Sequence, residues 1–343
     1  MKISKIVTTA AVSLLSLSLA ACGGGAGSGG GAKTIFKLAF NQTEQHPQYT
    51  AGVEFGKKLE EATQGRYTVK VYANEQLGGQ ADVIQNLSNG SVEMMWVGGP
   101  VMESYNPDFV VYNLPYMFDS VESFRATMAD LDAMKELYTS IEESKSITVL
   151  AGVYAGSRNV YNSKRPINTP ADLNGLKIRV QQSDSQVKMI EAMGAVASPM
   201  NNGEVYSALQ TGVIDGAENN EPTWDALKQS EVAKYYSYTQ HLMIPDYLLV
   251  STKVLNAMSE EDQEAFKKIV PEIQAMASDG FQAFTESSIE HATSIGAQFN
   301  QVEDKQAFKD LVQPLVDESI NANETRKALA ETITANNAAH PAK

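Results

Sequence analysis

An arginine lies in the middle of the polar face of a predicted strand. The segment LKIRVQ, residues 176–181, alternates apolar and polar side chains, which is the two-residue period of a strand with one apolar face. Arg179 is central on the polar face, and Gln181 points the same way. A buried guanidinium without a partner is very costly. Since its planar fork donates two parallel hydrogen bonds to a carboxylate, Arg179 predicts an acidic partner, either from the protein or from a bound molecule.

Motifs for catalysis or metal binding do not stand out elsewhere in the chain. There is no zinc-type spacing of histidines and cysteines, no G-x-S-x-G elbow and no Walker loop. The glycines of residues 23–31 follow an apolar N-terminal stretch instead of a strand, which argues against a dinucleotide loop. We therefore expect a binding protein rather than an enzyme, with no cofactor and no metal.

The N-terminus has the pattern of an export signal. Two lysines precede an apolar stretch from Ile6 to Ala21, which is short and weak for a membrane span. The stretch ends in LAAC, and Cys22 is the only cysteine of the chain. This sequence resembles the lipobox of bacterial lipoproteins, so Cys22 is predicted to carry the lipid after removal of residues 1–21. Residues 22–33 then read as a flexible glycine-rich tether.

Length and charge limit the remaining possibilities. A chain of 343 residues exceeds one ordinary core, which predicts two domains. The formal net charge of -14, with no basic stripe, argues against nucleic acid as a partner.

Strands and helices alternate along both halves of the sequence. This alternation favours an α/β fold with a mostly parallel sheet and helices on its faces. Predicted strands cover 34–40, 67–72, 92–97, 147–153, 176–181, 213–220 and 246–251, and predicted helices cover 46–65, 81–90, 183–194 and a stretch that begins near Ser259.

Several segments resemble one family of binding proteins. They match, in order and spacing, the solute-binding subunits of tripartite ATP-independent periplasmic (TRAP) transporters of the DctP type. The matching segments are NEQLGG (74–79), YNLPYMF (112–118), GSRNVYNSKRPINTPADLNGLKIRVQQSD (156–184), MGAVASPMNNGEVYSALQTGVIDGAENN (193–220) and AKYYSYTQH (233–241). The resemblance runs from about residue 35 to about residue 320.

This resemblance implies a two-domain fold like that of periplasmic binding proteins. The ligand cleft lies between the domains, and a long helix spans both. The expected boundaries are 34–155 plus about 244–285 for domain I and 156–243 plus about 286–335 for domain II.

The resemblance also assigns roles to individual residues. It implies that Arg179 pairs with a ligand carboxylate, that Arg158 is a second arginine near the ligand, and that Asn219 reaches the ligand. A structural salt bridge is the rival interpretation of Arg158. Further candidates for ligand contact are Gln181, Asn220, Asn41, His46, Gln80, Glu75 and Trp96, whereas Tyr236 and His241 are expected to pack in the interior.

The same resemblance suggests a class of ligand. VGGP, residues 97–100, stands where sialic-acid-binding members carry a glutamate, and GAENN before Pro222 looks like the branch that binds sugar acids such as glucuronate and galacturonate. Arg158 keeps a C4-dicarboxylate as an alternative, and a lipid-anchored enzyme is the rival from another class. The implied partners are the membrane permease subunits and, through Cys22, the membrane of the cell envelope, with the binding protein itself a monomer.

Overall fold

The computed structural model describes residues 33–342, and within this range strands and helices form around one mixed sheet. The strands run in the spatial order β2-β1-β3-β8-β4-β7-β5-β6, and β9 pairs with β8 off this path. Their bounds are β1 Thr34–Ala39, β2 Tyr67–Tyr72, β3 Met94–Gly98, β4 Ile147–Asn162, β5 Lys177–Val180, β6 Val196–Pro199, β7 Gly216–Asn219, β8 Tyr235–Ser251 and β9 Gln298–Gln301.

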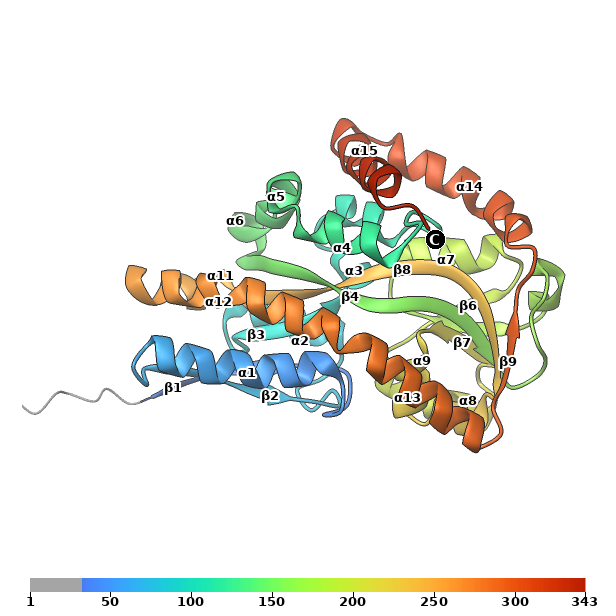
Figure 1. The fold of residues 1–343 in the computed structure, drawn as a ribbon, viewed down its shortest axis with the longest axis horizontal. Helices are drawn as coiled ribbons and strands as arrows, with labels where there is room; N and C mark the ends of the chain where they lie inside the picture. The colour runs from blue at the N-terminus through green and yellow to red at the C-terminus, as the bar shows by residue number, and fades with distance from the viewer. Residues whose placement is uncertain (1–32, 343) are drawn as a thin grey trace, which may run out of the picture. The chain divides into compact units, whose positions relative to one another are not determined.

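Helices surround the sheet on both faces (Figure 1). The α-helices are α1 Pro47–Ala62, α2 Gln80–Asn89, α3 Gly99–Met102, α4 Val121–Ala129, α5 Leu131–Thr139, α6 Glu142–Lys145, α7 Asp184–Ala192, α8 Val205–Thr211, α9 Glu221–Ala226, α10 Gln229–Val232, α11 Thr252–Asn256, α12 Glu260–Asp279, α13 Phe281–Ser294, α14 Gln306–Ile320 and α15 Glu324–Ala339. Short 3-10 helices are η1 Pro107–Asn113, η2 Pro170–Leu173 and η3 Asn202–Glu204.

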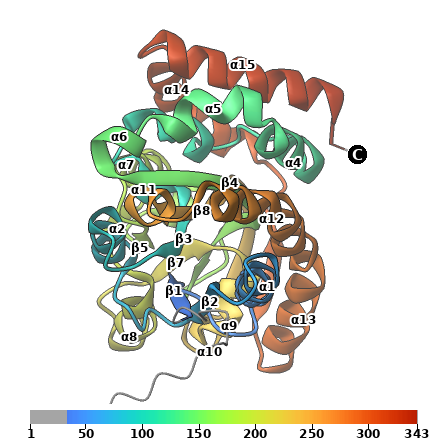
Figure 2. The same cartoon turned by 90° about the vertical axis from the view of Figure 1, so that its left-hand side faces the viewer.

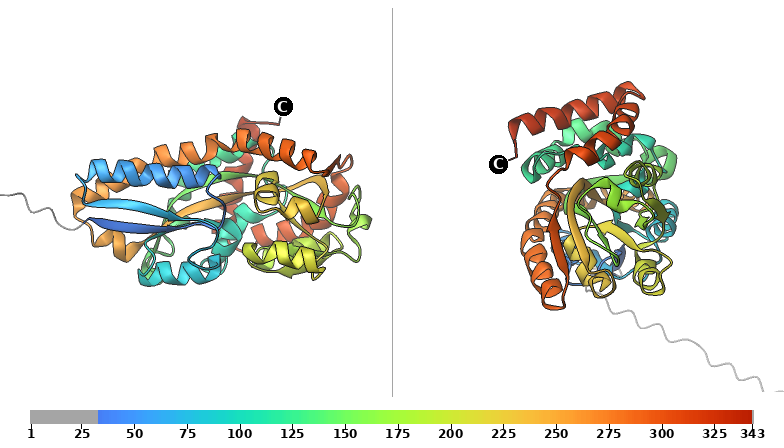
Figure 3. Two further views of the ribbon diagram at one scale, coloured as in Figure 1. Left: turned by 90° about the horizontal axis from the view of Figure 1, so that it is seen from below. Right: turned by 90° about the vertical axis from the view of Figure 1, so that its right-hand side faces the viewer.

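Two long antiparallel strands, β4 and β8, join the two regions of the sheet. The C-terminal part of β8 pairs with β3, and the C-terminal part of β4 pairs with β7. Between these regions β4 and β8 pair with each other. We call the region around β1, β2 and β3 lobe I and the region around β5, β6, β7 and β9 lobe II. Each lobe has its own apolar cores, and Figure 3 shows β9 beside β8 at the lobe II end. The predicted domain boundaries remain a prediction, because β4 and β8 belong to both lobes.

The predicted α/β architecture is confirmed, but the sheet is less parallel than expected. The β1–β2, β1–β3, β5–β6, β5–β7 and β8–β9 pairs are parallel, whereas β3–β8, β4–β7 and β4–β8 are antiparallel. The sequence pattern indicated only the first part of β4 and the last part of β8. Both strands are buried on two faces where they cross between lobes, so their ends lack a clean alternation.

The long spanning helix is present as two consecutive segments. α12 packs against α1 and β4, and α13 packs against α9 of lobe II. The helix is interrupted at Gly280, where an added Cβ atom would lie 3.1 Å from Cβ of Pro47. Figure 2 shows α4, α5, α14 and α15 gathered on one side of β4, with α1 on the other. In residues 33–342, none of the helices combines the length and the apolarity needed to cross a membrane.

Candidate functional site

Two adjoining hollows lie where β4 and β8 pass from lobe I to lobe II. We call them the Arg179 hollow and the Asp246 hollow, and together the cleft. They share wall residues Asn41, Gln80, Gln181 and Asn202. Each hollow leaves about 20 Å³ of open cavity, which holds about one water molecule. The free space of either hollow is therefore too small for a sugar-sized solute.

Arg179 reaches the cleft from β5 and is 3% exposed. Its Nε and Nη2 both donate to the backbone oxygen of Met200, at 3.0 Å and 2.7 Å. Among the described residues no carboxylate forms an ion pair with it. Burial is the main reason why the pKa of Arg179 is lowered. This guanidinium is therefore a buried positive charge without an ion pair, although the more distant charges of Glu218 and Glu75 act on it, and such a charge favours an anionic ligand.

Arg158 is different, because the protein itself neutralises it. Its Nε and Nη2 donate to the two carboxylate oxygens of Glu218 at 2.6 Å and 2.7 Å, and its Nη1 donates to Oδ1 of Asn219 at 2.7 Å. Burial is the largest influence and would raise the pKa of Glu218, but the charge of Arg158 and the hydrogen bonds from His241 and Arg158 together outweigh burial, and the pKa falls to about 2. Arg158 lines the Asp246 hollow, so a ligand contact stays a prediction.

His46 begins α1 and also lines the Asp246 hollow. Its Nδ1 accepts from the backbone N–H of Gln48 at 3.2 Å, so the neutral ring carries its proton on Nε2. Three phenylalanines surround the ring, and burial lowers the pKa of His46 to about 3. A neutral imidazole of this tautomer offers a ligand one N–H donor.

Glu75 connects the lobes at the Arg179 hollow. Its Oε2 accepts from the backbone N–H of Gly203 at 3.0 Å, while Oε1 is buried without a partner. Burial raises the pKa of this carboxyl group. Oε1 of Gln181 and both amide atoms of Asn202 are also buried without partners. Since buried polar atoms are normally hydrogen-bonded, these unpaired groups indicate a place for a polar ligand or for water.

The predicted amide contacts differ in how much of their bonding capacity is free. Asn220 is the N-cap of α9, and its amide also donates to the oxygen of Ala155, so it serves the fold. Oε1 of Gln80 accepts from Gly98 at 3.0 Å. Asn41 lines both hollows and has no side-chain hydrogen bond to the described residues, so it is free to contact a ligand.

Trp96 is the predicted contact that the structure places elsewhere. It lies in the core of lobe I, 1% exposed, and lines neither hollow. Six polar residues that line the cleft were not predicted from the sequence: Gln42, Gln182, Asn201, Asn202, Thr223 and Asp246. Asp246 could have been noticed in the sequence, because it is an acidic residue directly before the apolar strand segment YLLV.

A larger groove, of about 530 Å³, lies beside α7 and Arg326. Its buried carboxylate belongs to Glu103, which accepts from Asn113, Ser183 and Ser185. Because this acid is fully engaged by the protein, we place the site at the cleft. In residues 33–342, no group of three or more His, Cys, Asp or Glu side chains could hold a metal ion.

Residues 38–323 match the model of the DctP family, the bacterial extracellular solute-binding proteins of family 7. The chain belongs to this family. A solute-binding protein of Chromohalobacter salexigens is 35% identical over 296 residues, which cover 84% of this chain and 85% of that protein. The resemblance seen in the sequence is thereby confirmed.

Solved structures of TRAP periplasmic solute-binding proteins share the fold of this DctP-family chain. The protein of Anaerococcus prevotii, with bound α/β-D-glucuronate, is 34% identical and superimposes with a TM-score of 0.88, covering 90% of this chain and all of that chain. The protein of Xanthobacter autotrophicus, with bound β-D-galacturonate, is 32% identical with a TM-score of 0.82, covering 88% of this chain and 99% of that chain. Cys22 and the predicted signal and tether lie outside the described residues.

Proposed function

We propose that this protein is the extracytoplasmic receptor of a TRAP transporter and that it captures a uronate or a related sugar acid. The observation that carries the proposal is the buried guanidinium of Arg179, which has no carboxylate partner among the described residues and faces a cleft of polar groups. A uronate supplies one carboxylate for Arg179 and several hydroxyls for the amide, carboxylate and imidazole groups around it.

The binding energy is of the right size without covalent chemistry. Charged hydrogen bonds contribute roughly 1.5–3 kcal/mol each, and micromolar affinity needs about 8 kcal/mol. A bidentate contact to Arg179 with a few hydroxyl contacts is therefore sufficient. The ligand leaves unchanged, which distinguishes this function from that of an enzyme. The closed form then docks on the membrane permease, with the receptor a monomer held to the cell envelope by lipid on Cys22.

Calorimetry on ligand-free protein tests the proposal. D-glucuronate and D-galacturonate should bind, whereas glucose and galactose, which lack the carboxylate, should not. Arg179→Lys should lose at least tenfold in affinity because the two-point geometry is lost, and Arg165→Lys, a change at an exposed arginine outside the cleft, should not. Equal binding of the acids and the neutral sugars would refute the proposal.

A C4-dicarboxylate is the second candidate. It would place a second carboxylate in the cleft, where Arg158 would have to receive it. Both oxygens of Glu218 already engage Arg158. A dicarboxylate would therefore compete with an ion pair that the protein has completed, and the uronate is favoured.

A further inference from the structure

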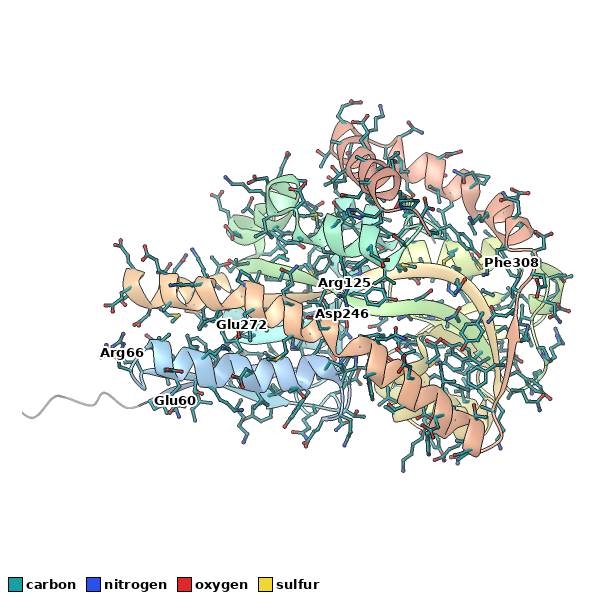
Figure 4. All side chains as sticks on the ribbon, in the orientation of Figure 1. Glu60, Arg66, Arg125, Asp246, Glu272 and Phe308 are labelled. Carbon is teal, nitrogen blue, oxygen red and sulfur yellow. The ribbon has the colours of Figure 1, made fainter. Side chains whose placement is uncertain are left out.

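Asp246 is an acidic side chain in the wall of the cleft that no predicted role accounts for. It lies on β8, opposite Gly98 of β3, at the point where β8 leaves lobe I. Figure 4 shows it near the middle of the ribbon, between the two lobes. The side chain lines the Asp246 hollow and is only partly covered.

The hydrogen-bonding capacity of Asp246 is largely unused. Its Oδ2 accepts from Nε2 of Gln48 at 3.0 Å, and the structure gives its other oxygen no donor in residues 33–342. A carboxylate has about four lone-pair sites. Burial raises the pKa of Asp246, because the hydrogen bond from Gln48 and the charge of Arg158 only partly compensate for lost hydration. The group is therefore an acceptor that lacks donors.

The cations near Asp246 do not supply those donors. The charge of Arg158 acts on Asp246, but its guanidinium is committed to Glu218 and Asn219. Arg179 lines the other hollow. The cleft thus holds a positive group without an ion pair, together with the carboxylate of Glu75, in one hollow, and a carboxylate that needs donors in the other.

We infer that Asp246 selects the ligand by its end remote from the carboxylate: it accepts a hydrogen bond from a hydroxyl and repels a second carboxylate. This inference rests on the proposed function, because it orients a uronate with its carboxylate at Arg179. A hydroxyl donates to Asp246, whereas a carboxylate at the same place brings two negative charges together without a free cation. The residue therefore separates sugar acids from dicarboxylic acids.

The first test compares the wild type with Asp246→Asn by calorimetry. The ligands are galacturonate and succinate, and Asp310→Asn, at an exposed position on α14, is the control. Asp246→Asn keeps the shape and removes the charge. We expect galacturonate affinity to fall by about tenfold and the ratio of galacturonate to succinate affinity to fall by more than that, since succinate is no longer repelled. If galacturonate affinity and the ratio both match the wild type, Asp246 is not the selector.

The second test uses only the wild type, so it does not depend on how the variant folds. Galactarate has a second carboxylate at C1. At the same carbon galacturonate has an aldehyde in its open form and a hydroxyl in its ring form. We expect at least a hundredfold weaker binding of galactarate. Equal affinity for the two acids would overturn the inference. Failure of the wild type to bind any uronate would instead remove the proposed function itself, so the two failures are distinguishable.

Discussion

Arg158 and Glu218 form a two-point ion pair in the interior, with Nε to Oε2 at 2.6 Å and Nη2 to Oε1 at 2.7 Å. The side chains are 5% and 0% exposed. Breaking one partner of a buried pair leaves an uncompensated charge, which costs about 3–5 kcal/mol. This pair therefore belongs to the framework of the cleft.

We predict that Glu218→Gln lowers the free energy of unfolding by about 3–5 kcal/mol. Urea unfolding of the ligand-free protein measures this loss. Glu324→Gln breaks an exposed pair with Lys327 and serves as the control, with an expected effect below about 1 kcal/mol. A loss as small as that of the control would show that Arg158 is not held by Glu218.

Arg179 should behave in the opposite way. We predict that Arg179→Met abolishes measurable uronate binding but leaves the ligand-free protein at least as stable as the wild type. The reason is that the native guanidinium is buried without an ion pair and burial outweighs the attraction of distant carboxylates, so its removal relieves a cost. Thermal melts with and without galacturonate give both quantities. A large loss of stability without ligand would mean that Arg179 serves the fold.

Acid should destabilise the fold in two overlapping ranges. The pKa of His46 is about 3 in the fold against 6.5 for the free group, so the unfolded chain binds more protons and stability falls from pH 6.5 toward pH 3. The full effect is about 5 kcal/mol at 1.36 kcal/mol per pH unit. The depressed pKa of Glu218 adds a loss between about pH 4.5 and pH 2.

Melting temperatures across pH 3–8 test this titration. His46→Asn keeps an N-cap acceptor for α1 but cannot titrate. The variant should be less stable at pH 7, because the ring contacts with phenylalanines are lost, yet its stability should change less between pH 6.5 and pH 4.5. An unchanged slope would assign the acid sensitivity to other groups.

The lobes also meet through side chains that lie over glycines. The side-chain oxygen of Asn201 in lobe II would be 2.6 Å from a Cβ at Gly79 in lobe I. We predict that Gly79→Ala weakens uronate affinity by roughly tenfold, because overpacking costs about 1–3 kcal/mol and obstructs closure. Adding Asn201→Ser, which shortens the obstructing side chain but keeps a capping oxygen, should restore most of the affinity. No recovery in the double variant would contradict the closure explanation.

The local sequence determined much of the scaffold. β2 lies at Tyr67–Tyr72 as predicted, and α1 and α7 differ from prediction by a few residues at their ends. In these elements the hydrophobic residues repeat with a clear period, and capping residues and glycines mark the helix ends. These are local properties of the chain. Arg179 was recognised for the same reason, since a charged residue in an otherwise regular strand is visible without any tertiary information.

Tertiary structure decided which charges are free. The sequence left a salt bridge open for Arg158 without naming its partner. Because β4 pairs with β7, Glu218 meets Arg158, while the hydrogen bonds of Arg179 go to a backbone oxygen. Asp246 became part of the site because β8 crosses between the lobes at that residue. Such relationships depend on pairings between strands far apart in the chain. The sequence resemblance therefore predicted a carboxylate-binding protein with Arg179 at the carboxylate, and the fold determined that Glu218 is the partner of Arg158.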